Sequence, residues 1–354
     1  MACTLTDIAK KTGYSVSTVS RVLHDQTRKY KISETTSVEV RRAADELGYT
    51  PNKLARGLRL KKTHQIGVVI PDVSNPFFAM MVKSVSKGAR KAGYSIIVSD
   101  SDEESNIEEE SIRALLENRV DGLLIAAVGQ EYSHIRDLKG SRTPFVMVDR
   151  WSSDLDVDAI SVDNFKGGYI ATGHLLREGH RNIAFIQGRR GTNANEGRLQ
   201  GFLAALKEAG VSVPPQYIVG DDFGTFNGYI ETKSLLRLQE PPSAVLAAGD
   251  LIALGVLQAL KEESVSIPEN ISLVTFDDPS FASYLSPPLT AVEQPVEKMG
   301  EMAIQLLIRR MRTPEAEIKQ ILLEPRLNVR ESVSRVIRLL DIKSRFDNGP
   351  LPPS

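Results

Sequence analysis

Residues 5–24 read LTDIAKKTGYSVSTVSRVLH, a stretch that predicts two short helices joined by a tight turn. Gly13 falls in the turn, where glycine accepts the left-handed backbone conformation of a helix end. Ala9 is small enough for the two helices to cross closely, and Val19 and Val22 have helical spacing toward the interior. The stretch therefore predicts a helix-turn-helix.

The second of these helices has the residues that DNA reading needs. In a helix-turn-helix, the N-terminal part of the second helix contacts base edges in the major groove. Val16 can pack on a thymine methyl group, Ser17 can hydrogen-bond a base edge, and Arg21 can reach a guanine or a phosphate. The helix start suits phosphate contacts. The expected DNA-binding residues of this helix are Ser15, Val16, Ser17, Thr18, Ser20 and Arg21.

Charge separates this head from the rest of the chain. Residues 1–62 contain 13 Lys and Arg but only 6 Asp and Glu, a net charge of +7. The remaining residues contain 31 basic and 39 acidic side chains, a net charge of −8. A basic head on an acidic body predicts a polyanionic partner for the head alone. A solvated basic surface on a generic three-helix bundle is the alternative.

Two more helices are expected before the chain changes character. Ser33 can cap a third helix that stops at Gly48, and Pro51 suits the first turn of a short fourth helix, NKLARGL. Residues 61–64 look like a linker. The third helix is expected to place three apolar side chains inward: Val38, Ala43 and Leu47.

From Ile66 onward, short apolar runs alternate with amphipathic helical segments, which predicts parallel sheets covered on both faces. A weak internal repeat relates residues 66–100 to residues 183–221, and two similar α/β lobes would form a cleft between them. The apolar runs are IGVVI (66–70), SIIV (95–98), LLIAAV (123–128), FVMV (145–148), IAFI (183–186), VLAA (245–248) and SLVTF (272–276).

The cleft would lie beyond the carboxyl ends of the strands, where ligands bind in parallel sheets. Polar residues follow the strand runs there: Asp72, Ser74, Asn75, Asp100, Arg150, Asp250 and Asp277. Carboxylates accept hydroxyl protons, arginine donates in a fork and an aromatic ring covers the apolar face of a sugar. This chemistry favours a polyhydroxylated ligand.

Other classes of protein lack support in the sequence. There is one cysteine, Cys3, so a disulfide framework is excluded. The five histidines show no metal-ligand spacing, no hydrolase, metalloprotease or nucleotide-binding motif is present, and no cofactor is expected. No apolar run approaches the ~18 residues of a membrane span, and the first residues lack a secretion signal. We expect a cytoplasmic protein with no membrane partner.

The chain resembles the LacI/GalR family of bacterial transcriptional regulators. The resemblance rests on LTDIAKKTGYSVSTVSRVL, ADELGYTPNKLARGL, IGVVIPDVSNPFF, SVDNFKGGYIATGHLLREGHRNIAFIQG, GDLIALGVLQAL and VTFDDPSFASYLSPPLTAVEQP, and spans residues 4–332. It implies a small all-α helix-turn-helix head with a hinge helix, then a two-lobed α/β core like that of periplasmic binding proteins. It also implies homodimers, sometimes paired as tetramers, on double-stranded operator DNA, and a small effector, often a sugar.

Residue roles follow from the same resemblance. It places Asn52, Ala55, Arg56 and Leu58 of the hinge at the minor groove, with Leu58 as a wedge into the central base step. It implies a ligand site in the cleft formed by Asp72, Asn75, Phe77, Arg150, Arg198, Phe223, Asp250 and Asp277. The segment HDQTRKYKIS (24–33) is longer and more basic than the family norm, and Gly249 replaces an Asn of many members.

The expected domains are a DNA-binding head at 1–50, a hinge and linker at 51–63, a ligand-binding and dimerisation core at 64–332, and an extension at 333–354. The expected function is repression of transcription under the control of a small effector. A solute-binding protein without regulation and a two-lobed α/β enzyme are the alternatives. Purines and a protein partner are alternatives to the sugar. Val333, Val336, Ile337 and Leu340 have helical spacing, so the extension is either a short helix or a frayed tail.

Overall fold

The computed structural model describes residues 3–49, 62–129 and 132–336. The chain divides into two compact units, Met1–Thr63 and His64–Ser354. The hinge residues predicted to meet the minor groove, Asn52, Ala55, Arg56 and Leu58, lie outside the described residues.

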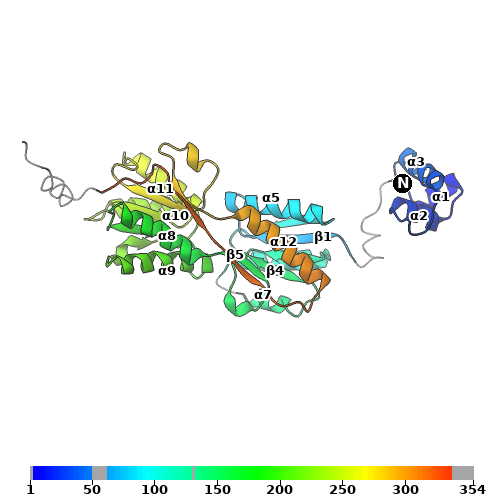
Figure 1. The fold of residues 1–354 in the computed structure, drawn as a ribbon, viewed down its shortest axis with the longest axis horizontal. Coiled ribbons are helices and arrows are strands. Elements are labelled where there is room, and N and C mark those ends of the chain that lie inside the picture. Colours follow the sequence, from blue (N-terminus) through cyan, green and yellow to red (C-terminus); the bar gives the residue numbers. More distant parts are fainter. Residues whose placement is uncertain (1–2, 50–61, 130–131, 337–354) are drawn as a thin grey trace, which may run out of the picture. The chain divides into compact units, whose positions relative to one another are not determined.

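The described part of the first unit is the predicted helix-turn-helix followed by one more helix (Figure 1). Its elements are α1 (Leu5–Thr12), α2 (Val16–Leu23) and α3 (Glu34–Glu46). The side chains of Thr4, Ser15 and Ser33 accept backbone N–H groups at the three helix starts, which confirms the cap predicted at Ser33. Gly13 ends α1 with φ 73°, a left-handed conformation that favours glycine.

The helices of the head bury a compact apolar core: Ile8, Ala9, Val19, Val22, Val40, Ala43 and Ala44. The expectation that Val38 points inward was wrong, because its side chain is 60% exposed. Two residues along a helix turn the side chain by roughly 200°. Once Val40 and Ala43 define the inward face, Val38 therefore lies on the opposite one.

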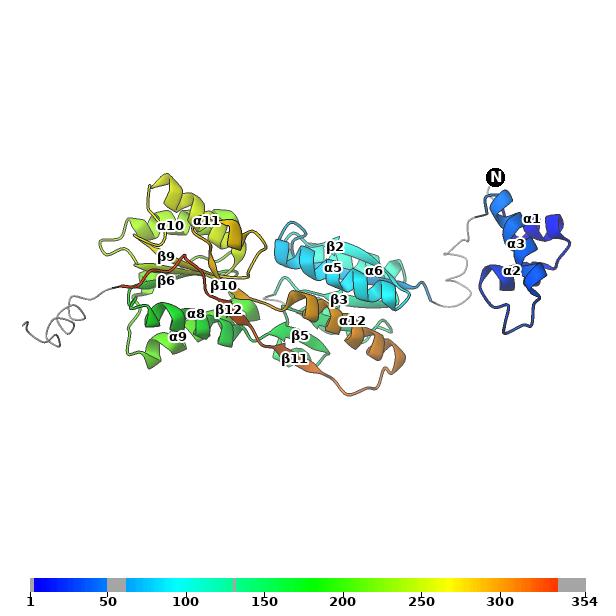
Figure 2. The ribbon, with the colours of Figure 1, turned by 45° about the horizontal axis from the view of Figure 1, so that its top comes forward.

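The second unit contains two six-stranded sheets, each the centre of a lobe (Figure 2). The first sheet has the strand order β11-β5-β4-β3-β1-β2, and all its strand pairs are parallel. Its strands are β1 (Gln65–Ile70), β2 (Ser95–Asp100), β3 (Gly122–Ile125), β4 (Phe145–Val148), β5 (Ala159–Val162) and β11 (Gln320–Leu323). The helices of this lobe are α5 (Pro76–Lys91), α6 (Ser105–Glu117), α7 (Ser133–Leu138) and α12 (Val296–Arg312), with a 3-10 turn, η1, at Ser153–Leu155.

The second sheet has the order β12-β10-β9-β8-β6-β7, and only the β10–β12 pair is antiparallel. Its strands are β6 (Ile183–Ile186), β7 (Ile218–Val219), β8 (Ala244–Ala247), β9 (Ser272–Phe276), β10 (Thr290–Glu293) and β12 (Arg326–Asn328). Its helices are α8 (Asn164–Arg177), α9 (Asn193–Glu208), α10 (Thr225–Leu236) and α11 (Asp250–Glu262), with 3-10 turns η2 (Pro215–Tyr217) and η3 (Ala282–Tyr284).

The central strands are buried on both faces, as the unbroken apolar runs predicted, whereas β2 at the end of the first sheet is half-buried or exposed. Along β1, Val68 and Ile70 belong to one apolar cluster and Val69 belongs to another on the opposite face. Helix α12 packs beside α5 and against β3 and β4, while α6 contacts β1 and β2. The internal repeat is also visible, since β1-α5-β2 in the first lobe corresponds to β6-α9-β7 in the second.

The chain passes between the lobes three times, after β5, after β10 and after β11. These crossings join the lobes at one side and leave their polar strand ends facing each other. Residues 333–336 continue along the second lobe without forming a helix, and the Val336 N–H donates to the Glu178 carbonyl at 2.8 Å. No helix in the described ranges is long and apolar enough to cross a membrane.

Candidate functional site

Helix α2 presents most of the predicted DNA-binding residues at the surface of the head. Ser15 is its N-cap and accepts the Thr18 N–H at 3.1 Å, which fixes the start of the helix. Val16 is 43% exposed, and Ser17 is exposed beside it. Their position in the first turn of α2 leaves both side chains open to a duplex, as base reading requires.

Ser20, predicted as a DNA contact, is not part of that exposed face. Its side chain is 8% exposed, because the His24 ring one turn later lies against it, 3.4 Å from the Ser20 hydroxyl. Arg21 is half-buried, and its guanidinium lies 3.9 Å from the ring centre of Tyr30 in the long basic link. The link therefore holds the predicted recognition arginine in place.

The second unit has a polar cavity of about 20 Å³ between its lobes, at the carboxyl ends of the strands. It has room for little more than one water molecule, so the lobes stand close together. The residues around it come from both sheets: Asn75, Phe77, Phe78, Asp149, Arg150, Ala194, Arg198, Phe223, Gly249, Asp250, Asp277 and Gln294. Of the residues predicted for the cleft, all line this cavity except Asp72, Ser74 and Asp100.

The side chain of Asp72 forms hydrogen bonds within its own loop instead of lining the cavity. Its carboxylate accepts the backbone N–H of Ser74 at 2.7 Å and the Ser74 hydroxyl at 2.6 Å, so it shapes the loop before α5. Asp100 likewise accepts the Val73 N–H at 2.8 Å. A carboxylate after a strand satisfies its own loop as readily as a ligand, and the sequence pattern could not separate these two uses.

Two aspartates at equivalent strand ends face the cavity from opposite lobes. Asp149 follows β4 and Asp277 follows β9, with left-handed φ angles of 64° and 68°. Such conformations are uncommon outside glycine and gather at functional sites. Asp277 accepts the Gln294 amide at 2.5 Å. Within the described residues, Asp149 Oδ1 and Gln294 Oε1 are buried without a hydrogen-bond partner. Two acceptors without a protein partner in one cavity can receive hydrogen bonds from a bound ligand or a water molecule.

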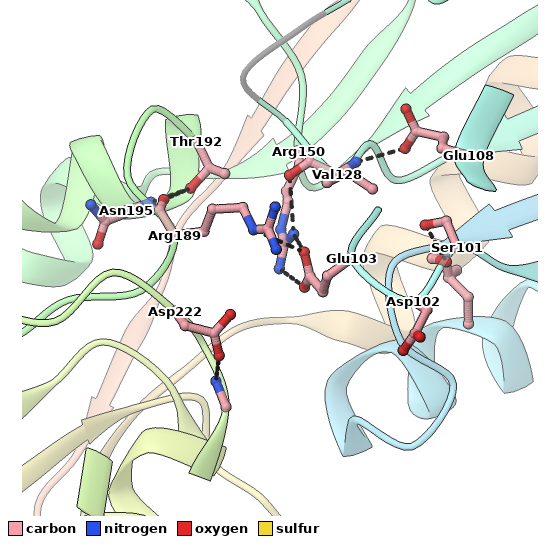
Figure 3. Close-up of polar contacts among 12 residues, drawn as sticks. Ser101, Asp102, Glu103, Glu108, Val128, Arg150, Arg189, Thr192, Asn195 and Asp222 are labelled. Carbon is pink, nitrogen blue, oxygen red and sulfur yellow. Dashed lines mark hydrogen bonds and ion pairs between the residues drawn. The ribbon is translucent and has the colours of Figure 1, made fainter. Parts of the chain in front are cut away.

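Two arginines face these acceptors. Arg198, on α9, is 3% exposed and donates to the Asn164 side chain at 2.8 Å and to the Ala248 carbonyl at 2.6 Å. Arg150 is also 3% exposed and pairs with Glu103 through both ends of its guanidinium (Figure 3). Both side chains are held rigidly, and each keeps N–H groups for a ligand, since an arginine has five donors.

Aromatic rings complete the walls. Phe223 of the second lobe lies 4.8 Å from the Arg150 guanidinium, and Phe77 and Phe78 line the cavity from α5. Gly188 makes room for Phe223, because a Cβ at that position would stand 2.1 Å from the ring. Aromatic faces beside paired polar groups suit a sugar, which has both hydroxyls and an apolar C–H face.

The carboxyl groups in the cavity hold their protons unusually strongly. Burial raises the pKa of Asp149 to about 6, although Arg150 and Arg198 oppose the shift. Burial also raises the pKa of Asp250, with a further contribution from Asp277, and burial raises the pKa of Asp277. For Arg198, burial lowers the pKa. Burial favours the uncharged form of each carboxyl group.

Sequence reasoning missed several lining residues. Phe78 has the helical spacing of a core residue, and it serves both the core and the cavity wall. Asp149 follows a predicted strand directly, a signal that was available. Gln294 follows β10, a strand that the apolar pattern did not reveal. In the described part of the chain, no group of three or more His, Cys, Asp or Glu side chains could hold a metal ion.

Each of the two units matches a known protein family. The family model described as bacterial regulatory proteins, lacI family, matches residues 4–52, and that of a periplasmic binding protein-like domain matches residues 172–333. The ribose operon repressor of Haemophilus influenzae is 33% identical over 330 residues, 93% of this chain and 98% of that protein.

Solved structures show the same likeness. A lac repressor dimer bound to operator and an anti-inducer has a TM-score of 0.82 and 25% identity, covering 94% of this chain and all of that one. A LacI family transcriptional regulator from Enterococcus faecium with bound ribose has a TM-score of 0.70 and 30% identity, covering 77% of this chain and all of that one.

Proposed function

Since this chain belongs to the LacI family of bacterial regulatory proteins, we propose that it represses transcription by binding operator DNA, and that a small sugar between its lobes sets its DNA affinity. Repression takes place at the chromosome, in the cytoplasm. The cleft serves for binding, and the proposal includes no catalytic step, metal or cofactor.

The DNA-binding part of the proposal rests on α2. Its first turn carries Val16 and Ser17 at the surface, its start is capped by Ser15, and Arg21 is ordered against Tyr30. The head that carries it has a net charge of +7, which favours a phosphate backbone. A homodimer would present two such helices to the half-sites of a near-palindromic operator.

The single observation that carries the effector assignment is the pair of buried, unsatisfied acceptors, Asp149 Oδ1 and Gln294 Oε1. Hydroxyl groups of a sugar would donate to these two atoms and accept from Arg150 and Arg198. Phe223 would cover the apolar face of the ring. Ribose is the first candidate ligand, because it is a small sugar. One relative is named as a ribose operon repressor, and a solved structure of another family member has ribose bound.

The two lobes supply a route from ligand to DNA. The cavity has walls from both sheets and holds little more than one water molecule, so the lobes would separate to admit a sugar, and the bound sugar would favour that wider spacing. A ligand shifts a conformational equilibrium only by such a difference in affinity. Operator affinity changes with the ligand to the extent that the head binds DNA better in one arrangement than in the other.

Two measurements test the proposal. Genomic fragments retained by the protein in a gel-shift selection should converge on a near-palindromic sequence, and fragments of random sequence would contradict operator recognition. A thermal-shift screen should show stabilisation by ribose, as expected for a ligand that binds the folded state. Stabilisation by purines alone would contradict the sugar assignment.

A further inference from the structure

Glu103 lies at the edge of the cleft, on a loop held in a fixed shape. The loop follows β2, and both Asp102 and Glu103 have left-handed φ angles, 49° and 56°. The Glu103 N–H donates to the Pro71 carbonyl at 2.9 Å, and Ser101 donates to the Ile70 carbonyl through its N–H, also at 2.9 Å. The loop is therefore tied to the end of β1. Its uncommon backbone aims one particular carboxylate at the cleft.

That carboxylate touches both lobes. Its two oxygens lie 2.7 Å and 2.8 Å from the two terminal nitrogens of Arg150, a bidentate pair (Figure 3). One of them is also 3.5 Å from Nε of Arg189, which belongs to the second lobe. Glu103 is 20% exposed, while Arg150 is 3% exposed and lines the cavity. Glu103 thus stands between the cavity arginine and the solvent.

The bidentate pair decides which groups Arg150 offers to a ligand. Glu103 takes one hydrogen from each terminal nitrogen, and the Val128 carbonyl takes the other hydrogen of Nη1 at 3.3 Å. This carboxylate therefore neutralises the guanidinium charge and fills one of its two forked edges. The donors that are left, the Nε–H and the second hydrogen of Nη2, can serve hydroxyl groups, and an anion that used them would meet an arginine whose charge is already paired.

The charges around the cavity also favour an uncharged ligand over an anion. Beside the two arginines stand three aspartates, Asp149, Asp250 and Asp277, and Glu103 is a fourth carboxyl group. An entering anion would find the charge of Arg150 already paired with the Glu103 carboxylate. In a site with little water, like charges repel strongly.

We propose that Glu103 is a specificity-determining positioning residue, which reserves the cleft for uncharged polyols and rejects their phosphorylated and carboxylated forms. It acts through Arg150 and need not contact the ligand itself. The proposal rests on the proposed function only in taking the cleft as the effector site. It explains why a site with two buried arginines would accept a neutral sugar.

The test compares the wild-type protein with Glu103→Gln, which removes the charge and keeps the shape. Glu104→Gln is the matched control, because Glu104 is the exposed neighbour on the same loop. Binding of ribose, a phosphate ester of ribose and inorganic phosphate is measured by calorimetry at constant ionic strength. We expect the wild-type protein and E104Q to bind ribose and to ignore both phosphates. E103Q should gain about tenfold or more in affinity for the phosphates, with a much smaller change for ribose.

Several results would overturn the inference. The first is a wild-type protein that binds the phosphate ester with the same affinity as ribose. The second is a wild-type protein in which inorganic phosphate competes with ribose. The third is an E103Q variant whose affinities for ribose and the phosphates have the same ratio as in the wild-type protein. If E103Q does not fold, the competition experiment on the wild-type protein still tests whether the cleft rejects phosphate. If the wild-type protein binds no sugar, the effector assignment fails. A gain of inorganic phosphate binding by E103Q over the wild-type protein would still support the role of Glu103.

Discussion

Asp149→Asn should stabilise the ligand-free protein while weakening its binding of sugar. The side chain is 3% exposed, its Oδ1 has no partner, and burial raises its pKa to about 6. Asparagine has the same shape and tolerates the left-handed φ of 64° at this position. The substitution therefore removes a charge from the cavity without adding backbone strain.

The size of the effect follows from the pKa. A rise from 3.8 to about 6 means that the folded state disfavours the ionised carboxyl group. At about 1.36 kcal/mol for each pKa unit, the cost is about 3 kcal/mol once the group is ionised in both states. Because the folded-state pKa is the higher one, this cost is absent below about pH 4 and appears as the pH rises through about 6.

Urea denaturation at about pH 7.5 and about pH 4 provides the assay. At the higher pH, D149N should be the more stable protein by up to about 3 kcal/mol, and at the lower pH the difference should shrink toward zero. The exposed Asp137→Asn on α7 is the control, with an expected change below about 0.5 kcal/mol. A D149N variant that is destabilised at the higher pH, or equally stabilised at both, would refute the reasoning.

Three further predictions concern the head and the cleft. Arg21→Ala should weaken operator binding by about 1–3 kcal/mol while ribose affinity stays unchanged, and equal gel shifts for mutant and wild type would contradict its role. Operator affinity should fall steeply with salt, with a slope of about −0.9 in log K for each neutralised phosphate. A flat dependence would argue against a duplex partner. Phe223→Ala should lower ribose affinity about tenfold or more in calorimetry, because the ring covers the sugar face. An unchanged affinity would remove Phe223 from the site.

Most of the fold could be predicted from the sequence because its signals are local. The capping residues Thr4, Ser15 and Ser33 mark helix starts through hydrogen bonds within one turn. Each of the seven apolar runs contains a strand, and all of these strands except β2 are buried on both faces, which needs an unbroken apolar run. The apolar pattern did not predict five strands, β5, β7, β10, β11 and β12. They are short or polar, or lie at a sheet edge, and their pairing depends on strands that are distant in sequence.

Some residues of the site could be predicted from the sequence, because their position relative to a strand or a family motif places them in the cleft. Others could not be predicted, because their place depends on contacts made in the folded chain. Asp277, which follows a predicted strand, lines the cleft as expected, and so does Arg198, which lies on α9 and was implied by the family resemblance. Asp72 has the same sequence context but bonds to Ser74, and Ser20 is shielded by His24. Glu103 gave no signal, because its role depends on a loop conformation that brings it to Arg150 across 47 residues of sequence. Such pairings appear only once the chain is folded.

The most direct test of the account measures operator affinity by fluorescence anisotropy with and without saturating ribose, for the wild-type protein and for Asp277→Asn. Asp277 lines the cavity and accepts a hydrogen bond from Gln294, and it belongs to a different unit from helix α2, which we propose as the DNA-reading helix. In the wild-type protein, ribose should change operator affinity by about fivefold or more, the range of allosteric coupling. The variant should keep its sugar-free operator affinity and lose the response. An operator affinity that ribose leaves unchanged in the wild-type protein, although calorimetry shows the sugar bound, would contradict the coupling of cleft to head.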